Sequence, residues 1–361
     1  MYKKGVLIVS RTQESNAKAE IVRQKLAELD ANAVVIRKQC NFSWITSGGR
    51  GFIGLASENA CGVIVVSKDA VYLFANNIEA GRLALEELPQ NFAEVVSIEW
   101  ENDGTLNQAI TQRVGSFVED SALEPFFKQQ RTALCEQEIV RYRALGSDAA
   151  AVLESVCVTL QKGMTEVEVA GLLAKEFWAR SIEPITLLIA ADDRSNYVRH
   201  YVPTQKRIEH GAIVSVCARR HGLIVSITRI VAFDKDFATG YGTLLKIEAD
   251  MLDAIRPGNR ISDVFAACCD SYTRNNLPNE WKNHHQGGMT AYLAREIRAD
   301  RTTNSAIAPN QAYAFNPSVK GAKCEDTVLV TENGLEFLTA PGAGWPTVQV
   351  GGYVRPGILY R

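Results

Sequence analysis

Two adjacent histidines, His284 and His285, stand before a glycine pair in the segment NHHQGGMTAYLARE, residues 283–296. The chain has five histidines, so any chemistry based on imidazole must draw on very few residues. The segment could be half of a metal site, a metal-free site of proton transfer, or a polar turn, because Gly287 and Gly288 permit conformations that a substituted residue resists. The other polar residues of the chain must decide among these three interpretations.

His200 is a further candidate for proton transfer. It lies in RHYVPT, shortly after an apolar run and before Pro203, where a strand gives way to a turn. An imidazole with an ordinary pKa of ~6.5 can take a proton from water and then give it to a departing nitrogen. We therefore predict a catalytic His200, with Tyr201 beside it in a substrate pocket. A surface loop histidine is the alternative.

Glu325 and Asn316 are polar residues at the edges of apolar strands. Glu325 and Asp326 precede the alternating run TVLVT, so their side chains face opposite sides of a sheet and one of them at most can face a pocket. Asn316 lies in the apolar run AFNPSV, where an unpartnered amide would cost ~1–3 kcal/mol. We expect Asn316 to bind either the backbone or a ligand.

Ser215 and Ser226 stand in two apolar runs that read as adjacent strands, AIVSVCARR and LIVSITRIVAF. Either serine could be small core filler bonded to backbone or could line a pocket. Arg229, in the second run, could anchor a substrate carboxylate or form a structural salt bridge.

The elements that must position these residues fall into two predicted domains, 1–122 and 123–361. The first alternates β-branched runs (GVLIVS, AVVIRK, GVIVVS) with helical patterns (NAKAEIVRQKLAELD, IEAGRLALEEL), which indicates a small α/β domain. Its glycine-rich TSGGRGF, residues 46–52, lacks the G-x-G-x-x-G spacing of a dinucleotide loop. We expect a turn there that presents Arg50 and Phe52.

The second domain opens with two helices, predicted over residues 135–161 and 164–180. Strands ITLLIAA, AIVSVCARR and LIVSITRIVAF follow, with a reverse turn at His221 and Gly222, and then helices over 245–256 and 261–275. The remaining strands come from AYAFNPSV and DTVLVTENGLEFLT. Helices and antiparallel strands are segregated, which predicts an α+β fold.

Composition excludes several classes of protein. A net charge of −2 with interspersed signs over 361 residues argues against nucleic-acid or polybasic membrane binding, and no apolar run reaches the length of a bilayer span. Eight cysteines in mostly apolar context, with no C-x-x-C pair, predict buried free thiols in a reducing cytoplasm. We expect a cytoplasmic protein that acts on a small molecule.

Four segments of the second domain, in order, resemble the creatinase/aminopeptidase P family. They are KGMTEVEVAGLL, RHYVPTQKRIEHGAIVSV, HGLIVSITRIV and KCEDTVLVTENGLEFLT. The resemblance implies a C-terminal domain with the pita-bread fold, preceded by the family's smaller α/β domain. Peptidases of the family hold two divalent metals through two aspartates, one histidine and two glutamates.

At the positions that match these ligands, the sequence departs from the family's pattern. The aspartate positions carry Ser215 and Ser226, the first glutamate position carries Asn316, and His285 (or His284, one register away) and Glu325 remain. A catalytic metal site usually takes at least three protein ligands, with carboxylates for hard divalent ions. We therefore predict no metal and no other cofactor.

The family includes members that work without metal, such as creatinase, and the segment with His285 and Arg295-Glu296 resembles their GHS…GRE segment. The resemblance implies that His200 moves the proton and that Glu325 grips the cationic part of a substrate. A second gripping glutamate is replaced by Thr228, which disfavours creatine itself. His285 is predicted to be catalytic as well, by stabilising the charge that develops on the substrate, and His284, Arg295 and Asn316 complete the predicted pocket.

Three functions remain open from the sequence. The first is a metal-independent hydrolase that opens a C–N bond of a small polar substrate, although ring opening or elimination would use the same groups. The second is a dipeptidase with one weakly bound metal at His285 and Glu325. The third is a protein that binds a ligand without turnover.

Family members of this type commonly pair so that the small domain of one chain reaches the pocket of the other. In this sequence WITSGGRGF would supply Arg50 and Phe52 for that purpose. A guanidinium and an aromatic ring can clamp a carboxylate and exclude water. We therefore expect a homodimer.

Overall fold

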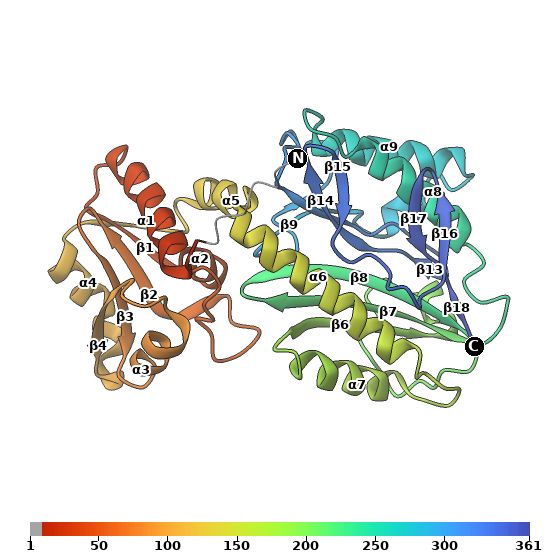
Figure 1. The fold of residues 1–361 in the computed structure, drawn as a ribbon, viewed down its shortest axis with the longest axis horizontal. Coiled ribbons are helices and arrows are strands. Elements are labelled where there is room, and N and C mark those ends of the chain that lie inside the picture. Colours follow the sequence, from red (N-terminus) through yellow and green to blue (C-terminus); the bar gives the residue numbers. More distant parts are fainter. Residues whose placement is uncertain (1–8) are drawn as a thin grey trace, which may run out of the picture. The chain divides into compact units, whose positions relative to one another are not determined.

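The computed structural model describes residues 9–361. Two compact units compose it, Met1–Glu138 and Ile139–Arg361 (Figure 1). The strand expected over residues 5–10 falls largely outside the described residues.

The first unit is built on one mixed sheet with the strand order β4-β3-β2-β1-β5. Its strands are β1 (Ala33–Lys38), β2 (Asn59–Ser67), β3 (Val71–Asn76), β4 (Glu94–Ile98) and β5 (Phe117–Glu119). Its helices are α1 (Arg11–Ala27), α2 (Gln39–Ile45), α3 (Ala80–Arg82), η1 (Leu83–Glu87), η2 (Trp100–Thr105), α4 (Leu106–Val114) and α5 (Glu124–Thr132). The expected α/β character of this region is present.

Local capping explains where two of the predicted helices begin. Ser10 accepts a hydrogen bond from the backbone N–H of Gln13, whose side chain accepts one from Ser10, and this capping box starts α1. Thr165 and Glu168 form the same box at the start of α7 (Glu166–Trp178). Each box satisfies amide groups that the first helical turn leaves without an intrahelical partner.

The second unit combines two larger sheets with flanking helices. One sheet has the order β18-β8-β7-β6 and the other β10-β9-β11-β14-β15. The strands are β6 (Glu183–Ala191), β7 (Gly211–Arg220), β8 (Leu223–Ala232), β9 (Gly287–Thr290), β10 (Ile297–Arg298), β11 (Ala312–Phe315), β12 (Ser318–Val319), β13 (Ala322–Lys323), β14 (Asp326–Thr331), β15 (Gly334–Phe337), β16 (Thr347–Val350), β17 (Tyr353–Pro356) and β18 (Leu359–Tyr360). The helices are α6 (Glu136–Cys157), α7, η3 (Asp192–Asn196), α8 (Tyr241–Ala254), α9 (Ile261–Arg274) and η4 (Glu280–Asn283).

The hairpin of β7 and β8 brings the two predicted pocket serines together. Its turn has positive φ angles at both His221 (53°) and Gly222 (78°), the conformation that suits a two-residue hairpin. In the resulting register Ser215 pairs with Thr228, and Ser226 pairs with Cys217. The two serines therefore lie two residues apart along the ladder, on adjacent strands.

Strand β14 crosses β8 and joins the two sheets of the second unit. The backbone N–H of Thr228 donates to the carbonyl of Glu325 at 2.8 Å. The N–H of Ser226 donates to the hydroxyl of Thr327, also at 2.8 Å. These bonds hold the start of β14 against the strand that carries Ser226.

Helices α8 and α9 pack together over the apolar core of this unit.

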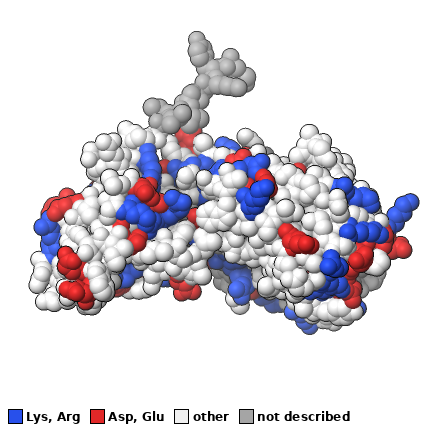
Figure 2. Space-filling model, turned by 90° about the horizontal axis from the view of Figure 1, so that it is seen from below, with Lys and Arg blue, Asp and Glu red and all other residues white. Residues whose placement is uncertain are grey.

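Surface and thiol properties follow the composition. On the face in Figure 2, basic and acidic side chains are interspersed. All eight cysteines are free thiols, and five of them are buried, as the sequence predicts. Among the helices of residues 9–361, none is long and apolar enough to cross a bilayer.

Candidate functional site

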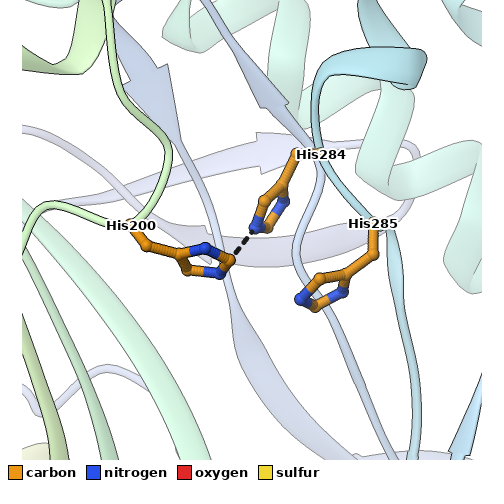
Figure 3. Close-up of side chains that lie close together, drawn as sticks. All are labelled: His200, His284 and His285. Carbon is orange, nitrogen blue, oxygen red and sulfur yellow. Dashed lines mark hydrogen bonds between the residues drawn. The ribbon is translucent and has the colours of Figure 1, made fainter.

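Three imidazoles meet at the end of two loops in the second unit. His200 lies in the loop after η3, and His284 and His285 directly follow η4. The ring centroids of His284 and His285 are 4.4 Å apart, and His200 lies 5.1 Å and 5.9 Å from them. Figure 3 shows the His200 ring pointing toward the other two. An ion pair of Arg199 and Glu280 ties the two loops together beside the cluster.

Hydrogen bonds constrain the tautomers of this histidine cluster, which comprises His200, His284 and His285. The backbone N–H of Gly287 donates to Nδ1 of His285 at 3.3 Å, so the proton of neutral His285 resides on Nε2. Nε2 of His284 lies 3.4 Å from Nε2 of His200, and one of these two nitrogens must donate. Nδ1 of His284 has no partner among the described residues. His285 can therefore offer an N–H to a ligand.

All three imidazoles favour the neutral form. Burial, followed by the charge of Lys323, lowers the pKa of His200 below its usual value. The same two causes lower the pKa of His284 to about 3. Burial and the charge of Arg295 lower that of His285 to about 4. A neutral imidazole can accept a proton, so the cluster is a set of bases at neutral pH.

The glycine pair after the histidines is required by close backbone contacts. Gly287 has φ of 97°, and a Cβ there would lie 2.3 Å from the carbonyl oxygen of Ala314. A Cβ on Gly288 would lie 2.1 Å from the carbonyl oxygen of Ile297. No other residue type fits such contacts. The pair lets β9 run tightly between β10 and β11, which fixes the position of the histidines before it.

A network of buried charges centres on Glu325, beside the cluster. Its Oε2 lies 2.9 Å from Nζ of Lys323, and its Oε1 lies 2.5 Å from Nη2 of Arg295. Nζ of Lys323 also donates to Oγ of Ser215 at 3.5 Å. Nη1 of Arg295 donates to Oγ of Ser226 at 3.4 Å. Both oxygens of Glu325 are thus held by cations of its own chain.

This pairing fixes the charges of the network. Burial alone would raise the pKa of Glu325, but the charges of Lys323 and Arg295 lower it to about 2. Burial would lower the pKa of Lys323, but Glu325 raises it above its usual value. At neutral pH the network carries two positive charges and one negative charge, next to three neutral imidazoles.

Asn316 and Tyr201 also border this region. Asn316 is buried and follows Phe315, whose register partner in β14 is Asp326, so it stands across from Glu325. Its side-chain Oδ1 has no partner in the part of the chain that the structure describes. Tyr201 is buried between His284 and Lys323, at a small cavity lined by all three. An unpaired acceptor such as Oδ1 of Asn316 is suited to a ligand donor.

The remaining predicted residues are Arg229 in the second unit and Arg50 and Phe52 in the first. Arg229 is fully buried and bonded to Glu154 and Asp326, so the salt-bridge alternative describes its position. Arg50 belongs to the first unit, where its guanidinium pairs with Glu87 at 2.9 Å. Phe52 follows in the same loop and is half-buried.

Sequence reasoning missed Lys323, although a readable signal existed. Residues 323 and 325 are two apart in an extended segment, so their side chains share a face. The resemblance implies that Glu325 grips a cationic substrate. In this structure Lys323 and Arg295 pair with both of its carboxylate oxygens.

The two-sheet α+β fold, with a polar site beside the strand that joins the sheets, defines a protein of the pita-bread class. The model of metallopeptidase family M24 matches residues 141–332. This is more than half of the chain, and the protein therefore belongs to that family.

Known proteins support this assignment over longer stretches. An uncharacterized peptidase of Staphylococcus epidermidis is 20% identical over 351 residues, covering 89% of this chain and 98% of the relative. A probable dipeptidase, PepE of Mycobacterium tuberculosis, is 25% identical over 210 residues, covering 55% and 56%. The prolidase of Pyrococcus horikoshii superposes with a TM-score of 0.74 at 18% identity, covering 91% of this chain and 99% of the prolidase.

The metal pair implied by the family does not fit the residues of this site. Hydroxyls replace two carboxylates at Ser215 and Ser226, and an amide replaces a third at Asn316. Both carboxylate oxygens of the matched glutamate, Glu325, are paired with Lys323 and Arg295. A dication would meet two fixed positive charges and would lack the carboxylates that normally balance it.

Within residues 9–361, two groups of residues have atoms close enough to share a metal, with all ligand atoms within 4.8 Å of one another. One is the histidine cluster. The other lies in the first unit and consists of Glu14, Cys135 and Glu138. Nζ of Lys18 lies 2.8 Å from Glu14 and 2.7 Å from Glu138, so the carboxylates of the second group already have a cation.

Proposed function

We propose that this protein is a hydrolase that opens a C–N bond of a small polar substrate without a metal, with His200 as general base and then general acid. One observation carries the proposal. His200 is exposed, the neutral form of its imidazole is favoured, and its Nε2 lies 3.4 Å from a second imidazole that also favours the neutral form. Such a group can accept the proton of a water molecule.

The reaction would proceed in two proton transfers. His200 takes a proton from water while the water oxygen bonds to the carbon of the C–N bond. Nε2–H of His285 donates to the negative charge that develops on the substrate. The C–N bond then breaks with its electron pair on nitrogen, and His200 returns the proton to that nitrogen. Asn316 would accept a hydrogen bond from the polar group of the substrate.

Glu325 acts through its neighbours in this scheme. Its carboxylate holds Lys323 and Arg295 in place and does not touch the substrate. Lys323 and Arg295 lower the pKa values of the nearby imidazoles. Glu325 is thus a positioning residue.

The experiment is a turnover assay on protein treated with a chelator. The panel contains dipeptides, Xaa-Pro dipeptides, small amides and guanidino compounds, and release of amine or ammonia is followed. We expect turnover that the chelator does not reduce. His200→Ala should lower kcat by ~10²–10⁴-fold, which is the range of general acid–base catalysis.

His210→Ala is the matched control, because His210 is an exposed histidine of the same unit that pairs with Asp234. It should keep full activity, and both variants should melt within a few degrees of the native protein. Turnover that survives in His200→Ala would refute the role of His200. Ligand binding with no turnover across the panel would favour a binding protein instead.

A second candidate function rests on the histidine cluster itself. Its three imidazoles could hold a single transition metal, since zinc accepts three histidine ligands in some enzymes. Elemental analysis of protein purified without chelator separates the two candidates. One metal per chain, lost in His284→Ala, would favour the metallopeptidase, and a content near zero would favour the metal-independent hydrolase.

A further inference from the structure

We propose that Lys323 and Arg295 together replace the charge of the family's metal pair, and that these two tethered cations themselves keep divalent metals out of the site. The inference goes beyond the proposed hydrolysis, because it concerns metal binding and holds whether or not a substrate is turned over.

The contacts of the two cations carry this proposal. Lys323 contacts Ser215, and Arg295 contacts Ser226, so each cation reaches one of the two matched aspartate positions. Glu325 bridges both cations, one with each carboxylate oxygen. The arrangement has two positive centres, one bridging carboxylate and a small side chain beside each centre. Serine leaves room at each position that an aspartate would fill.

Burial makes the cations a fixed part of the fold. The side chains of Lys323 and Glu325 are 6% and 4% exposed. That of Arg295 is 13% exposed. A buried charge is stable when paired, so removal of one cation leaves Glu325 short of positive charge. Glu325 should then bind a replacement cation more tightly than it does in the native protein.

The replacement changes the chemistry that is available. A bound metal can activate water by coordination, whereas an ammonium or guanidinium can supply N–H donors and positive charge alone. The proton of water must then go to a base. The three neutral imidazoles beside the cation pair can provide that base.

The experiment restores the lost carboxylates with the cations present or absent. The first variant carries Ser215→Asp, Ser226→Asp and Asn316→Glu. The second carries these changes with Lys323→Ala and Arg295→Ala. Isothermal titration with Mn²⁺ measures binding, and we expect the second variant to bind at least ~100-fold more tightly, because like charges repel strongly at short range.

Equal or tighter binding of Mn²⁺ by the first variant would overturn the proposal, since the lost carboxylates alone would then explain metal exclusion. Failure of a folded second variant to bind Mn²⁺ would also overturn it. Thermal melting establishes that each variant is folded before titration.

A test in the nearly native chain covers the case in which the multiple variants do not fold. Lys323→Ala should lower Tm, and ethylammonium, slightly shorter than the deleted chain, should raise it again by binding the folded state. Ethylammonium should not affect the native protein or Lys320→Ala, a control at an exposed lysine of the same region. If ethylammonium does not raise the Tm of Lys323→Ala, the site does not bind a cation in place of the lysine ammonium, and the proposal fails.

A separate observation concerns the small cavity behind His284. Its volume is about 10 Å³, which is near the space that one water molecule needs. Four buried polar atoms at its wall make no hydrogen bond to described residues: Oγ of Ser195, the hydroxyl of Tyr201, Nδ1 of His284 and Oγ of Ser318. Burial raises the pKa of Tyr201 above its usual value, and the nearby Ser215 hydroxyl offsets part of this rise.

We infer that one water molecule binds these four groups and accepts a hydrogen bond from Nδ1–H of His284. That bond would place the proton of His284 on Nδ1, so Nε2 of His284 would accept from Nε2–H of His200. Nδ1 of His200 would then carry the lone pair that accepts the proton of the substrate water. The bound water would be a positioning element for the tautomers of the cluster.

A crystal structure at high resolution and ¹⁵N NMR of the imidazoles test this inference. We expect a density peak within hydrogen-bond distance of at least three of the four atoms, and an Nδ1–H tautomer for His284. Ser195→Val, which fills the cavity, should remove the peak and shift the tautomer. A dry cavity in the native protein, or an unchanged tautomer in Ser195→Val, would overturn the assignment.

Discussion

Glu325 and Asp326 are adjacent carboxylates that meet the same kind of partner in different surroundings. Each is held by two cations, Glu325 by Lys323 and Arg295, and Asp326 by Arg229 and Arg355. The environment of Asp326 is closed, because both of its arginines are buried and are also paired, one with Glu154 and the other with Glu248. The environment of Glu325 borders the histidine cluster.

The difference shows that a buried ion network does not by itself mark a functional site. The Asp326 network satisfies its carboxylate with Arg229, Arg355 and Thr339 and contacts no imidazole of the cluster. Beside Glu325, by contrast, Asn316 and His284 present polar atoms with no partner among the described residues. Nη1 of Arg355 in the Asp326 network is also unpaired among the described residues. The Glu325 region is therefore distinguished by unpaired atoms that lie beside the histidine cluster and can meet a ligand.

The largest effect should come from Asp326→Asn. The substitution keeps the shape of the side chain but leaves two buried guanidinium groups short of negative charge. We expect a loss of ~3–5 kcal/mol in the free energy of unfolding, measured by denaturant titration. Glu336→Gln, whose pair with Arg143 is exposed, should cost no more than ~1 kcal/mol. If Asp326→Asn also cost no more than ~1 kcal/mol, the Asp326 network would not have the structural role assigned to it.

Glu325→Gln should affect activity more than stability. The site borders the exposed His200, so solvent can partly relieve the unpaired cations, and we expect a stability loss of ~1–3 kcal/mol. Activity should fall by more than ~10-fold, because Lys323 and Arg295 lose the group that positions them. Parallel melting and kinetic measurements test this. Wild-type kcat in a destabilised variant would contradict the assigned role.

The pH profile should follow the protonation of His200. Its pKa is lowered from the usual value, so the base form is already dominant below that value, and kcat/KM should rise with pH and level off before neutrality. Lys323→Met removes a positive charge that lowers this pKa, so the rising limb should move to higher pH. Asp326→Asn should not move it, and an equal shift there would break the distinction between the two carboxylates.

The smallest effect on stability should come from Arg50, whose pair with Glu87 offers a third, surface example. The Arg50 side chain is 49% exposed, so Arg50→Ala should cost no more than ~1 kcal/mol. If the protein is a homodimer in which this loop reaches the partner's pocket, the variant should nevertheless weaken substrate binding. Mixing it with His200→Ala should restore some activity. A monomeric mass by light scattering would contradict this prediction.

Much of the second unit could be predicted because its elements have clear patterns. The hairpin turn at His221 and Gly222 and the apolar strands on either side are local features. Helix α2, in contrast, escaped prediction because all seven of its residues are buried, including Gln39 and Asn41. Asn41 donates to Asp120, a long-range bond that conceals the usual apolar periodicity.

The candidate site could be predicted in its residue types but not in its pairings. The contact of His200 with His284 depends on the ion pair of Arg199 with Glu280, which are 81 residues apart. A single sequence does not show such a pair. Packing likewise determines that Arg295 pairs with Glu325, and the sequence alone does not indicate which acidic residue is its partner. The spacing of Lys323 and Glu325 was the one pairing open to local reasoning.

Glu325 immediately precedes β14 and Asp326 is its first residue, which has a consequence for dynamics. Local opening of β14 would break the core arginine pairs and the site's cation pairs together, so it should require nearly the free energy of global unfolding. Amide hydrogens of β14 should therefore exchange with solvent about as slowly as those of the protein core. The charged half of the site is a rigid platform, and motion during a reaction must come from the loop that carries His200.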